Sequence, residues 1–374
     1  MDLTGRRVIL STLISVGLLL ALPLAGVWSA GMPVAAFFEF PPLTRRVQPA
    51  PFSWGAFGAL ICMTAGCLAL LTARGIRSYR QAAPVVPAAG RRFPQWGWLA
   101  VFCGAAAWLL AWTRLPWMAP IQPHTFTPLW LAYIFGVNAL CLRRTGRSLL
   151  THRPRFFWAL FPASAAFWWI FEYLNRFVQN WYYEGPALGP WAYFGFATLP
   201  FSTVLPAVMS TRDWVASWGW VWRAFGNLAP VTGWRHPALP WVLGGTAAIG
   251  LAGIGPWPQL LFPLVWVAPF VIPAAGRSLM GLPQPLQVLR SRDWTPIVSV
   301  MLAALICGFF WELWNYYSLA RWKYAIPYVQ RFEIFEMPLL GYGGYLPFGL
   351  ECALAAALVQ DLLQDGARAT PRPG

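Results

Sequence analysis

The chain has 374 residues, of which 58% are hydrophobic and only 10% are charged, whereas a soluble globular domain carries about 25% charged residues. Its apolar runs continue over about 17–23 residues, the length of a membrane-spanning helix, which excludes the alternating strands of roughly ten residues that build outer-membrane barrels. The net charge of +15 would suit a nucleic-acid-binding protein, but no sequence motif of that class is present. We therefore expect no nucleic-acid partner.

The apolar segments predict an all-α, polytopic membrane protein of about ten transmembrane helices. The fourth, seventh and eighth segments are short or contain proline. In chain order the predicted helices cover residues 8–30, 52–73, 96–113, 129–142, 156–175, 191–209, 238–254, 259–275, 296–318 and 339–360.

The distribution of charged residues predicts which side of the membrane each loop faces. With the N-terminus in the cytoplasm, 20 of the 27 basic residues fall on the cytoplasmic side, in agreement with the positive-inside rule. All five Asp fall on that side too, whereas all seven Glu lie within the membrane or on the outer side. The sequence thus predicts a multi-pass protein of the bacterial cytoplasmic (inner) membrane with both termini in the cytoplasm.

Residues 1–95 precede the repeated part of the chain and form a predicted helix pair followed by a linker. Arg6 and Arg7 come before the first apolar run, which is long enough to be a retained signal anchor. Residues 81–95 are rich in Pro, Ala and Arg and predict a flexible cytoplasmic linker. The first two helices lie outside the repeat and are therefore candidate docking elements for a membrane-protein partner.

A tandem duplication is the most informative pattern in the sequence. Gly146-Arg-Ser-Leu recurs as Gly276-Arg-Ser-Leu, Glu172-x-x-Asn175 as Glu312-x-x-Asn315, and Leu199-Pro-Phe as Leu346-Pro-Phe. Each copy holds four predicted helices, so the two copies share one orientation and a pseudo-twofold axis along the membrane normal. The predicted units are 96–237 for repeat 1 and 238–374 for repeat 2.

Residues 212–227 predict an amphipathic helix on the cytoplasmic leaflet at the end of repeat 1. One face carries apolar residues at helical spacing, namely Trp214, Trp218, Val221, Trp222 and Phe225. This helix is an anchoring element or a second docking candidate for a membrane-protein partner.

Carboxyls at membrane depth are the candidate catalytic groups, because ionisable residues there are costly and usually functional. Glu172 and Glu312 each lie 16 residues into a predicted helix, about 24 Å from its cytoplasmic end. The i,i+3 spacing places Asn175 and Asn315 on the same face, where each amide can orient the carboxyl or bind a substrate carbonyl. The alternative is that Glu172 and Glu312 form ion pairs that pin helix ends, with Arg176, Arg321 or Lys323.

Glu351 lies nearer the predicted centre of the bilayer, and repeat 1 has Val204 at the matching position. Repeat 2 is therefore the better candidate for the active half. Neighbouring aromatic, acidic and proline residues predict a substrate pocket around these carboxyls, formed by Trp311, Trp322, Tyr324, Glu336, Tyr342 and Pro347. The density of Pro and Gly over residues 335–351 predicts a re-entrant or kinked segment that lines the site, with glycine-mediated helix packing as the alternative.

The sequence contains no motif for a bound cofactor or metal. It lacks a P-loop, a dinucleotide fingerprint and an H-E-x-x-H pair, and its three His residues are outside the predicted spans. We therefore expect acid–base chemistry without a cofactor or a metal.

Two motif sets resemble known membrane proteins. Phe171-Glu-Tyr-Leu-Asn175 and Phe310-Trp-Glu-Leu-Trp-Asn-Tyr316, with Phe335-Glu-Met-Pro-Leu339, resemble a group of bacterial multi-pass membrane proteins with no assigned activity. The Trp–acid pair followed by Trp-x-Tyr and a Pro-containing acidic helix is similar to the duplicated lycopene-cyclase-type membrane domains. That similarity implies chemistry on an isoprenoid. The chain departs from their Pro-x-Glu-Glu pattern with Pro347-Phe-Gly-Leu-Glu351, so cyclase activity is not carried over.

Three functions are compatible with these features. The first is a membrane-embedded acid–base enzyme acting on an apolar lipid or isoprenoid, with Glu312 and Glu351 as the proton-handling groups, Asn315 as the orienting residue, and Glu172 and Asn175 as pseudo-symmetric support. The second is a transporter of lipids or small molecules, which the parallel repeat favours. The third is a non-catalytic scaffold or assembly factor of a membrane complex.

Overall fold

The computed structural model describes residues 3–42, 47–80, 92–185, 187–231 and 236–369, and most of them are helical. Most of the linker expected at 81–95 lies outside these residues. The main helices are α1 Leu3–Ser29, α2 Trp54–Arg80, α3 Gln95–Trp112, α4 Phe126–Thr145, α6 Pro154–Val178, α7 Pro190–Phe201, α8 Val204–Ala216, α10 Leu239–Ala252, α12 Leu264–Leu279, α13 Thr295–Tyr316 and α14 Gly341–Ala369.

Short elements connect these helices. They are α5 Leu149–His152, α9 Gly219–Phe225, α11 Pro258–Leu261, the 3₁₀ turns Val34–Phe38, Pro116–Met118, Gln122–His124 and Pro285–Arg290, and the strands β1 Trp181–Glu184, β2 Arg321–Tyr324, β3 Glu333–Ile334 and β4 Met337–Pro338. The strands form two antiparallel pairs, β1–β2 and β3–β4.

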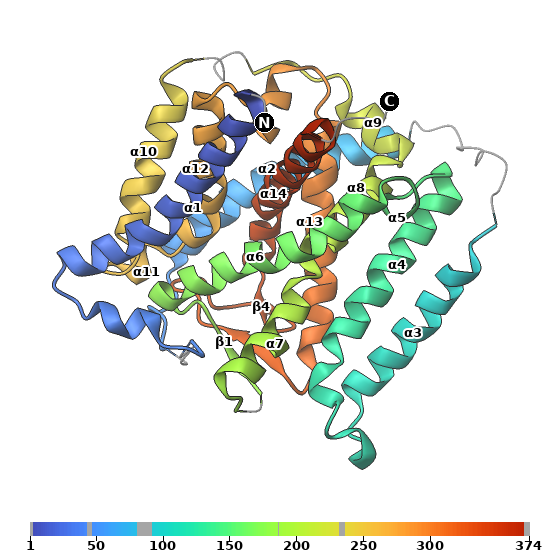
Figure 1. Cartoon of the computed structure of the whole chain (residues 1–374), viewed down its shortest axis with the longest axis horizontal. Helices are drawn as coiled ribbons and strands as arrows, with labels where there is room; N and C mark the ends of the chain where they lie inside the picture. Colours follow the sequence, from blue (N-terminus) through green and yellow to red (C-terminus); the bar gives the residue numbers. More distant parts are fainter. Residues whose placement is uncertain (1–2, 43–46, 81–91, 186, 232–235, 370–374) are drawn as a thin grey trace.

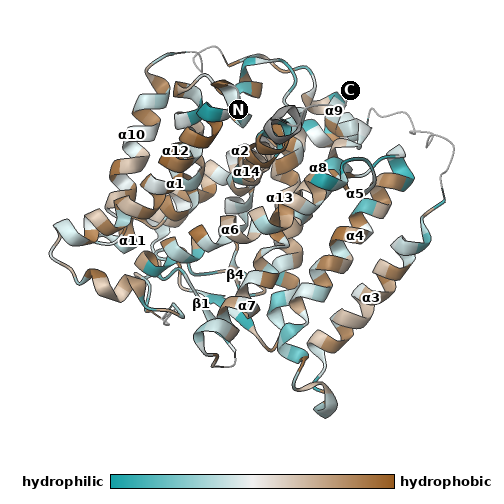
Figure 2. Ribbon diagram, viewed as in Figure 1, coloured by the Kyte–Doolittle hydropathy of each residue, from teal (hydrophilic) through white to brown (hydrophobic). Residues whose placement is uncertain are grey.

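Seven helical stretches in the described residues are long and apolar enough to cross a membrane. Figure 2 shows that the helices consist largely of apolar residues and that hydrophilic residues gather near their ends. The seven stretches are α1, α2, α3, Gln122–Thr145, Pro190–Ala216, α13 and Gly341–Gln364. The chain is therefore an all-α protein of the membrane class.

The other three predicted spans are also helical. The span predicted at 156–175 is α6, whose 25 residues extend about 37 Å at 1.5 Å per residue. The span predicted at 238–254 corresponds to the shorter apolar helix α10. The span predicted at 259–275 is divided between α11 and the apolar helix α12, with a turn at residues 262–263. A count of ten membrane-crossing helices remains a prediction.

The structure differs from the continuous span predicted at 191–209. It has a break at residues 202–203, between α7 and α8. The buried hydroxyl of Ser164 in α6 donates to the Phe201 carbonyl at 2.5 Å and accepts from the Leu205 amide at 3.0 Å. Residues 201 and 205 would bond each other in a continuous helix. Ser164 therefore takes the place of one backbone hydrogen bond, a recognised cause of a helix break.

The single amphipathic helix predicted over residues 212–227 is wrong in two respects. The segment is divided into the end of α8 and the separate helix α9, with Ser217 and Trp218 between them. Its predicted apolar face is also divided, because Val221 and Phe225 are buried whereas Trp222 is 63% exposed. The buried side packs on α2 and α13.

The segment predicted to be re-entrant or kinked has a different form. Residues 333–338 form the β3–β4 hairpin, and α14 then runs through Pro347 to Ala369 as one helix. A Cβ atom on Gly349 would lie 2.5 Å from the Val300 carbonyl oxygen, and one on Gly308 would lie 2.3 Å from the Tyr345 ring. These glycines permit the close approach of α13 and α14, as the alternative prediction of glycine-mediated packing requires.

The helices pack in corresponding pairs. Helix α3 packs on α4, and α10 packs on α12 in the same way. Helices α6 and α13 both pack on α8 and α14. Helix α1 lies against α10, α12, α6 and α14. Both chain ends lie at one end of the bundle, here called the terminus end, and β1 lies toward the opposite end, here called the ribbon end (Figure 1).

Candidate functional site

The first Glu-x-x-Asn motif forms a corner where α6 meets β1. The buried side chain of Asn175 donates from Nδ2 to the Trp181 carbonyl at 2.8 Å. Its Oδ1 accepts from the backbone amides of Asn180 at 2.8 Å and Trp181 at 3.3 Å. Gln179 adopts the left-handed conformation at φ 53°, which ends the helix. The Asn side chain therefore holds the strand against the end of the helix that precedes it.

The second motif forms an equivalent corner where α13 meets β2. Asn315 donates from Nδ2 to the Trp322 carbonyl at 2.8 Å, and its Oδ1 accepts from the Trp322 amide at 2.8 Å. Among the described residues no hydrogen bond joins either amide to Glu172 or Glu312, and the expectation that these amides bind a substrate carbonyl stays a prediction. Both Asn side chains use their amide groups on the backbone of the following strand.

The strands of the two corners pair with each other. Trp181 pairs with Tyr324 and Tyr183 pairs with Trp322 in an antiparallel register. In sequence, Trp181-Tyr-Tyr183 matches Trp322-Lys-Tyr324. The register therefore maps each strand onto the other. We call this β1–β2 pair the ribbon.

The buried carboxyls of the two corners accept hydrogen bonds from aromatic side chains. Glu172 Oε1 accepts from Trp168 Nε1 at 3.2 Å, from Trp181 Nε1 at 3.0 Å and from the Tyr183 hydroxyl. In both corners the second oxygen, Oε2, has no partner among the described residues.

Glu312 has a comparable set of partners. Its Oε1 accepts from the hydroxyls of Tyr324 and Tyr345, both at 2.7 Å. Trp322 Nε1 in turn donates to the Tyr324 hydroxyl at 2.8 Å. Burial raises the pKa of Tyr183 and Tyr324 well above the usual value, and the neighbouring Glu172 and Glu312 raise it further. Both hydroxyls therefore keep their protons and act as donors.

The ion pairs proposed as an alternative for these carboxyls are not formed. Arg176 donates to the carbonyls of Phe37 and Glu39. Arg321 pairs with Glu184 at 3.0 Å and with Glu336 at 3.8 Å, and Lys323 pairs with Glu184 at 3.7 Å. The charges thus form a separate, partly exposed network on the ribbon.

The structure brings part of the predicted pocket together around Glu312. Trp322 and Tyr324 belong to its hydrogen-bond network, and the Trp311 ring lies 5.9 Å from that of Tyr345. Glu336 forms an ion pair with Arg321 at 3.8 Å instead, and the Tyr342 hydroxyl donates to the Ile334 carbonyl at 3.1 Å. Pro347, predicted to line the pocket, is exposed on α14.

Glu351 lies in a different place from Glu312. Its side chain is 1% exposed, and neither carboxyl oxygen has a hydrogen-bond partner in the described part of the chain. It lines a cavity of about 110 Å³ formed where α1, α6, α12 and α14 meet. The walls are mostly apolar and include Val16, Leu19, Phe167, Ile170, Phe171, Pro269, Pro273, Leu354, Ala355 and Leu358.

The same cavity has polar groups toward the terminus end, which the sequence did not reveal. Ser11, Thr12 and Ser15 of α1 and Arg277 of α12 line it together with Glu351. Arg277 is 4% exposed and pairs with Asp361 of α14 at 2.7 Å. In the sequence, the repeated Gly-Arg-Ser-Leu motif was the only pattern that singled out Arg277. The contribution of α1 could not be predicted, because the sequence does not show that α1 packs against α12 and α14.

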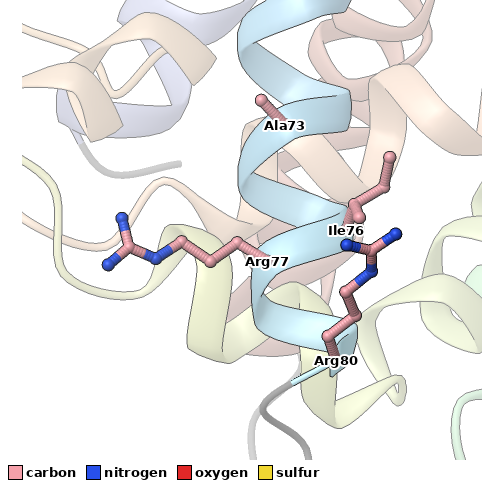
Figure 3. Close-up of a pocket in the computed structure, with 4 residues that line it drawn as sticks. All are labelled: Ala73, Ile76, Arg77 and Arg80. Carbon is pink, nitrogen blue, oxygen red and sulfur yellow. The ribbon is translucent and has the colours of Figure 1, made fainter.

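A second hollow, at the end of α2, has no features of a site. Figure 3 shows Ala73, Ile76, Arg77 and Arg80 projecting in different directions from this one helix. Across the described residues, no group of three or more His, Cys, Asp or Glu side chains is arranged to hold a metal ion. The Glu351 cavity is therefore the best candidate functional site.

Comparisons with known proteins assign no family to this chain. No protein-family model, curated protein or solved structure matches it.

Proposed function

We propose that the protein is a membrane-embedded acid–base enzyme that acts on an apolar lipid or isoprenoid, with Glu351 as its proton-handling group. The observation that carries this proposal is a fully buried carboxyl that faces an apolar cavity without a hydrogen-bond partner among the described residues. A buried, unpaired carboxyl costs free energy of folding. Such a cost is characteristic of functional sites.

The cavity walls support a reaction on an apolar group. A carboxylic acid in an apolar environment is a competent proton donor, because the surroundings favour its neutral form over its ion. The rings of Phe167 and Phe171 lie in the same cavity. Aromatic faces attract positive charge, so these rings stabilise any cation that forms when an isoprenoid double bond is protonated. Glu351 then takes a proton back from the neighbouring carbon, so the carboxyl is regenerated.

In this proposal the two corner carboxyls have a structural role. Glu172 and Glu312 fix the ribbon through Trp and Tyr donors, and Asn175 and Asn315 fix it through the backbone. The sequence-based assignment of Glu312 as a second proton-handling group, with Asn315 as its orienting residue, is therefore not part of the proposal.

The proposal includes the duplicated architecture and the membrane orientation. The equivalent Asn contacts, the self-matching register of the ribbon and the corresponding helix pairs support a duplication of repeats 96–237 and 238–374. The excess of basic residues on one side supports cytoplasmic termini in the bacterial inner membrane. The Glu351 cavity then lies between the repeats, because α6 belongs to one copy and α12 and α14 to the other.

The test is untargeted mass spectrometry of lipids and pigments from a deletion strain that carries the wild type, Glu351→Gln or Glu312→Gln. We expect one species to vanish on deletion and a precursor to accumulate. The wild type and Glu312→Gln should restore the profile, because the amide oxygen of the introduced glutamine still accepts the tyrosine hydrogen bonds, whereas Glu351→Gln should not. Identical profiles in the deletion and wild-type strains would overturn the proposal.

A transporter is the second candidate, because the cavity lies between the proposed repeats, where parallel-repeat transporters bind their substrates. It predicts that cavity residues are accessible from each side of the membrane in turn. Cysteine substitutions at Leu354 and Leu358 in sealed vesicles test this by labelling from either side. Labelling from one side under all conditions contradicts transport.

A further inference from the structure

The guanidinium of Arg277 has hydrogen-bond donors that the protein does not use. Its Nε donates to the Pro283 carbonyl at 2.6 Å, and its Nη2 donates to Asp361 at 2.7 Å. A guanidinium carries five N–H donors, so Nη1 and one hydrogen of Nη2 have no partner among the residues that the structure describes. Arg277 is only 4% exposed, yet its Nη1 is not among the buried atoms that lack a partner, so this donor reaches accessible space.

A second unused donor lies beside Arg277. Ser15 Oγ donates to the Ser11 carbonyl at 2.7 Å, whereas the Ser11 hydroxyl donates to no described residue. A Cβ atom on Gly276 would be 3.6 Å from Ser11 Oγ, which places this hydroxyl next to the residue preceding Arg277. Both side chains line the Glu351 cavity. This end of the cavity therefore combines the guanidinium of Arg277, whose charge is paired with Asp361, with unused N–H and O–H donors.

Apolar side chains of α14 line the cavity between Glu351 and Asp361, the partner of Arg277. Glu351, Leu354 and Leu358 of α14 line the cavity, and seven residues of helix extend over about 10 Å. Thr12, Val16 and Leu358 are only half-buried, so the cavity opens onto the outer surface of the bundle. Its volume of about 110 Å³ is smaller than the roughly 150 Å³ cavity that holds benzene. It suits a small head and the first part of a chain, with the remainder lying along α1.

We propose that the cavity binds an amphiphile with one anionic head, a phosphate or a carboxylate, on a single apolar chain. The head contacts Arg277 and Ser11, because a guanidinium matches the oxygens of these anions. The chain then runs past Leu358 and Leu354 toward Glu351. This inference rests on the proposed function and names the substrate class of the same site, but binding can be measured without turnover.

The test compares the binding of farnesyl phosphate and farnesol to the purified full-length protein in lipid nanodiscs. We expect at least tenfold tighter binding of farnesyl phosphate, and at least a tenfold loss of that binding in Arg277→Gln with farnesol unaffected. Arg292→Gln is the matched control, because Arg292 belongs to a neighbouring loop and pairs with the exposed Asn227. It should leave both affinities unchanged.

Two further variants separate the possible failures. Arg277→Gln combined with Asp361→Asn removes both charges of the ion pair, so the loss of binding is tested without a lone buried charge. Glu351→Gln should bind farnesyl phosphate within twofold of the wild type, even where turnover is lost.

Competition with laurate identifies the head group. If laurate displaces farnesyl phosphate, any single anionic head is accepted, and if it does not, the site selects phosphate.

Equal affinities for farnesyl phosphate and farnesol, or equal binding by wild type and both Arg277 variants, would overturn the inference. Tight binding of farnesyl phosphate in a protein whose deletion changes no lipid would contradict the proposed enzyme while leaving this binding site intact.

Discussion

Glu312 and Glu351 are both buried carboxyls of the C-terminal helices α13 and α14, yet their surroundings differ. Glu312 accepts two tyrosine hydroxyls at 2.7 Å inside a packed aromatic network. Glu351 has no hydrogen-bond partner among the described residues and faces a cavity. The contrast teaches that depth in the membrane does not by itself identify a functional acid. The partners of the carboxyl decide whether it stabilises the fold or is available for a ligand.

The largest effect is expected from the Asn residues that fix the corners. Asn175→Ala should lower the free energy of unfolding by about 2–5 kcal/mol, because it leaves buried backbone groups of Asn180 and Trp181 unpaired. Asn315→Ala should behave similarly. Unfolding of the purified protein by denaturant in micelles measures this. Asn227→Ala, at an exposed position, is the control, and a loss as small as the control's would contradict the structural role of the corners.

The two glutamates should respond oppositely to replacement by leucine. Glu312→Leu should destabilise the protein by about 1–3 kcal/mol, because the Tyr324 and Tyr345 hydroxyls lose their acceptor. Glu351→Leu should stabilise it by about 1–2 kcal/mol, because an unpaired buried carboxyl is removed. The same unfolding measurement compares them. Destabilisation by both variants would remove the distinction between the two sites.

An effect of similar size is expected where α13 and α14 approach each other. Gly349→Ala should destabilise the protein by about 1–3 kcal/mol, because its Cβ would lie 2.5 Å from the Val300 carbonyl oxygen and the backbone must move. Gly344→Ala is a matched control on the same helix with open space around it, and it should stabilise by about 0.5–1 kcal/mol. Equal unfolding midpoints for the two variants would show that the helices can separate without cost.

The sequence predicts the helices better than their interruptions. Every segment predicted to span the membrane is helical, because apolar runs of this length leave the backbone few other ways to satisfy its hydrogen bonds. The break after Phe201 depends on the Ser164 hydroxyl, which comes from another helix. The division of residues 212–227 likewise depends on packing against α2 and α13. Such tertiary contacts leave no periodic signal in the sequence.

The candidate site was predicted only in part. The sequence identifies Glu351 as a carboxyl at membrane depth with no counterpart in repeat 1. It places Glu312 and Glu351 in one site, although only Glu351 reaches the cavity lined by Ser11 and Arg277. The roles of Asn175 and Asn315 were missed because their partners are backbone groups of strands that follow each helix, and backbone groups are the same in every sequence.

The ribbon also constrains how the molecule can move. Strands β1 and β2 follow directly after α6 and α13 and pair through Trp181–Tyr324 and Tyr183–Trp322, so these two helices are tied together at one end only. If α6 and α13 separate while the ribbon stays paired, the ribbon end acts as the hinge of that motion. Access to the space between the helices would therefore widen progressively toward the terminus end, where Arg277 and Asp361 form their ion pair.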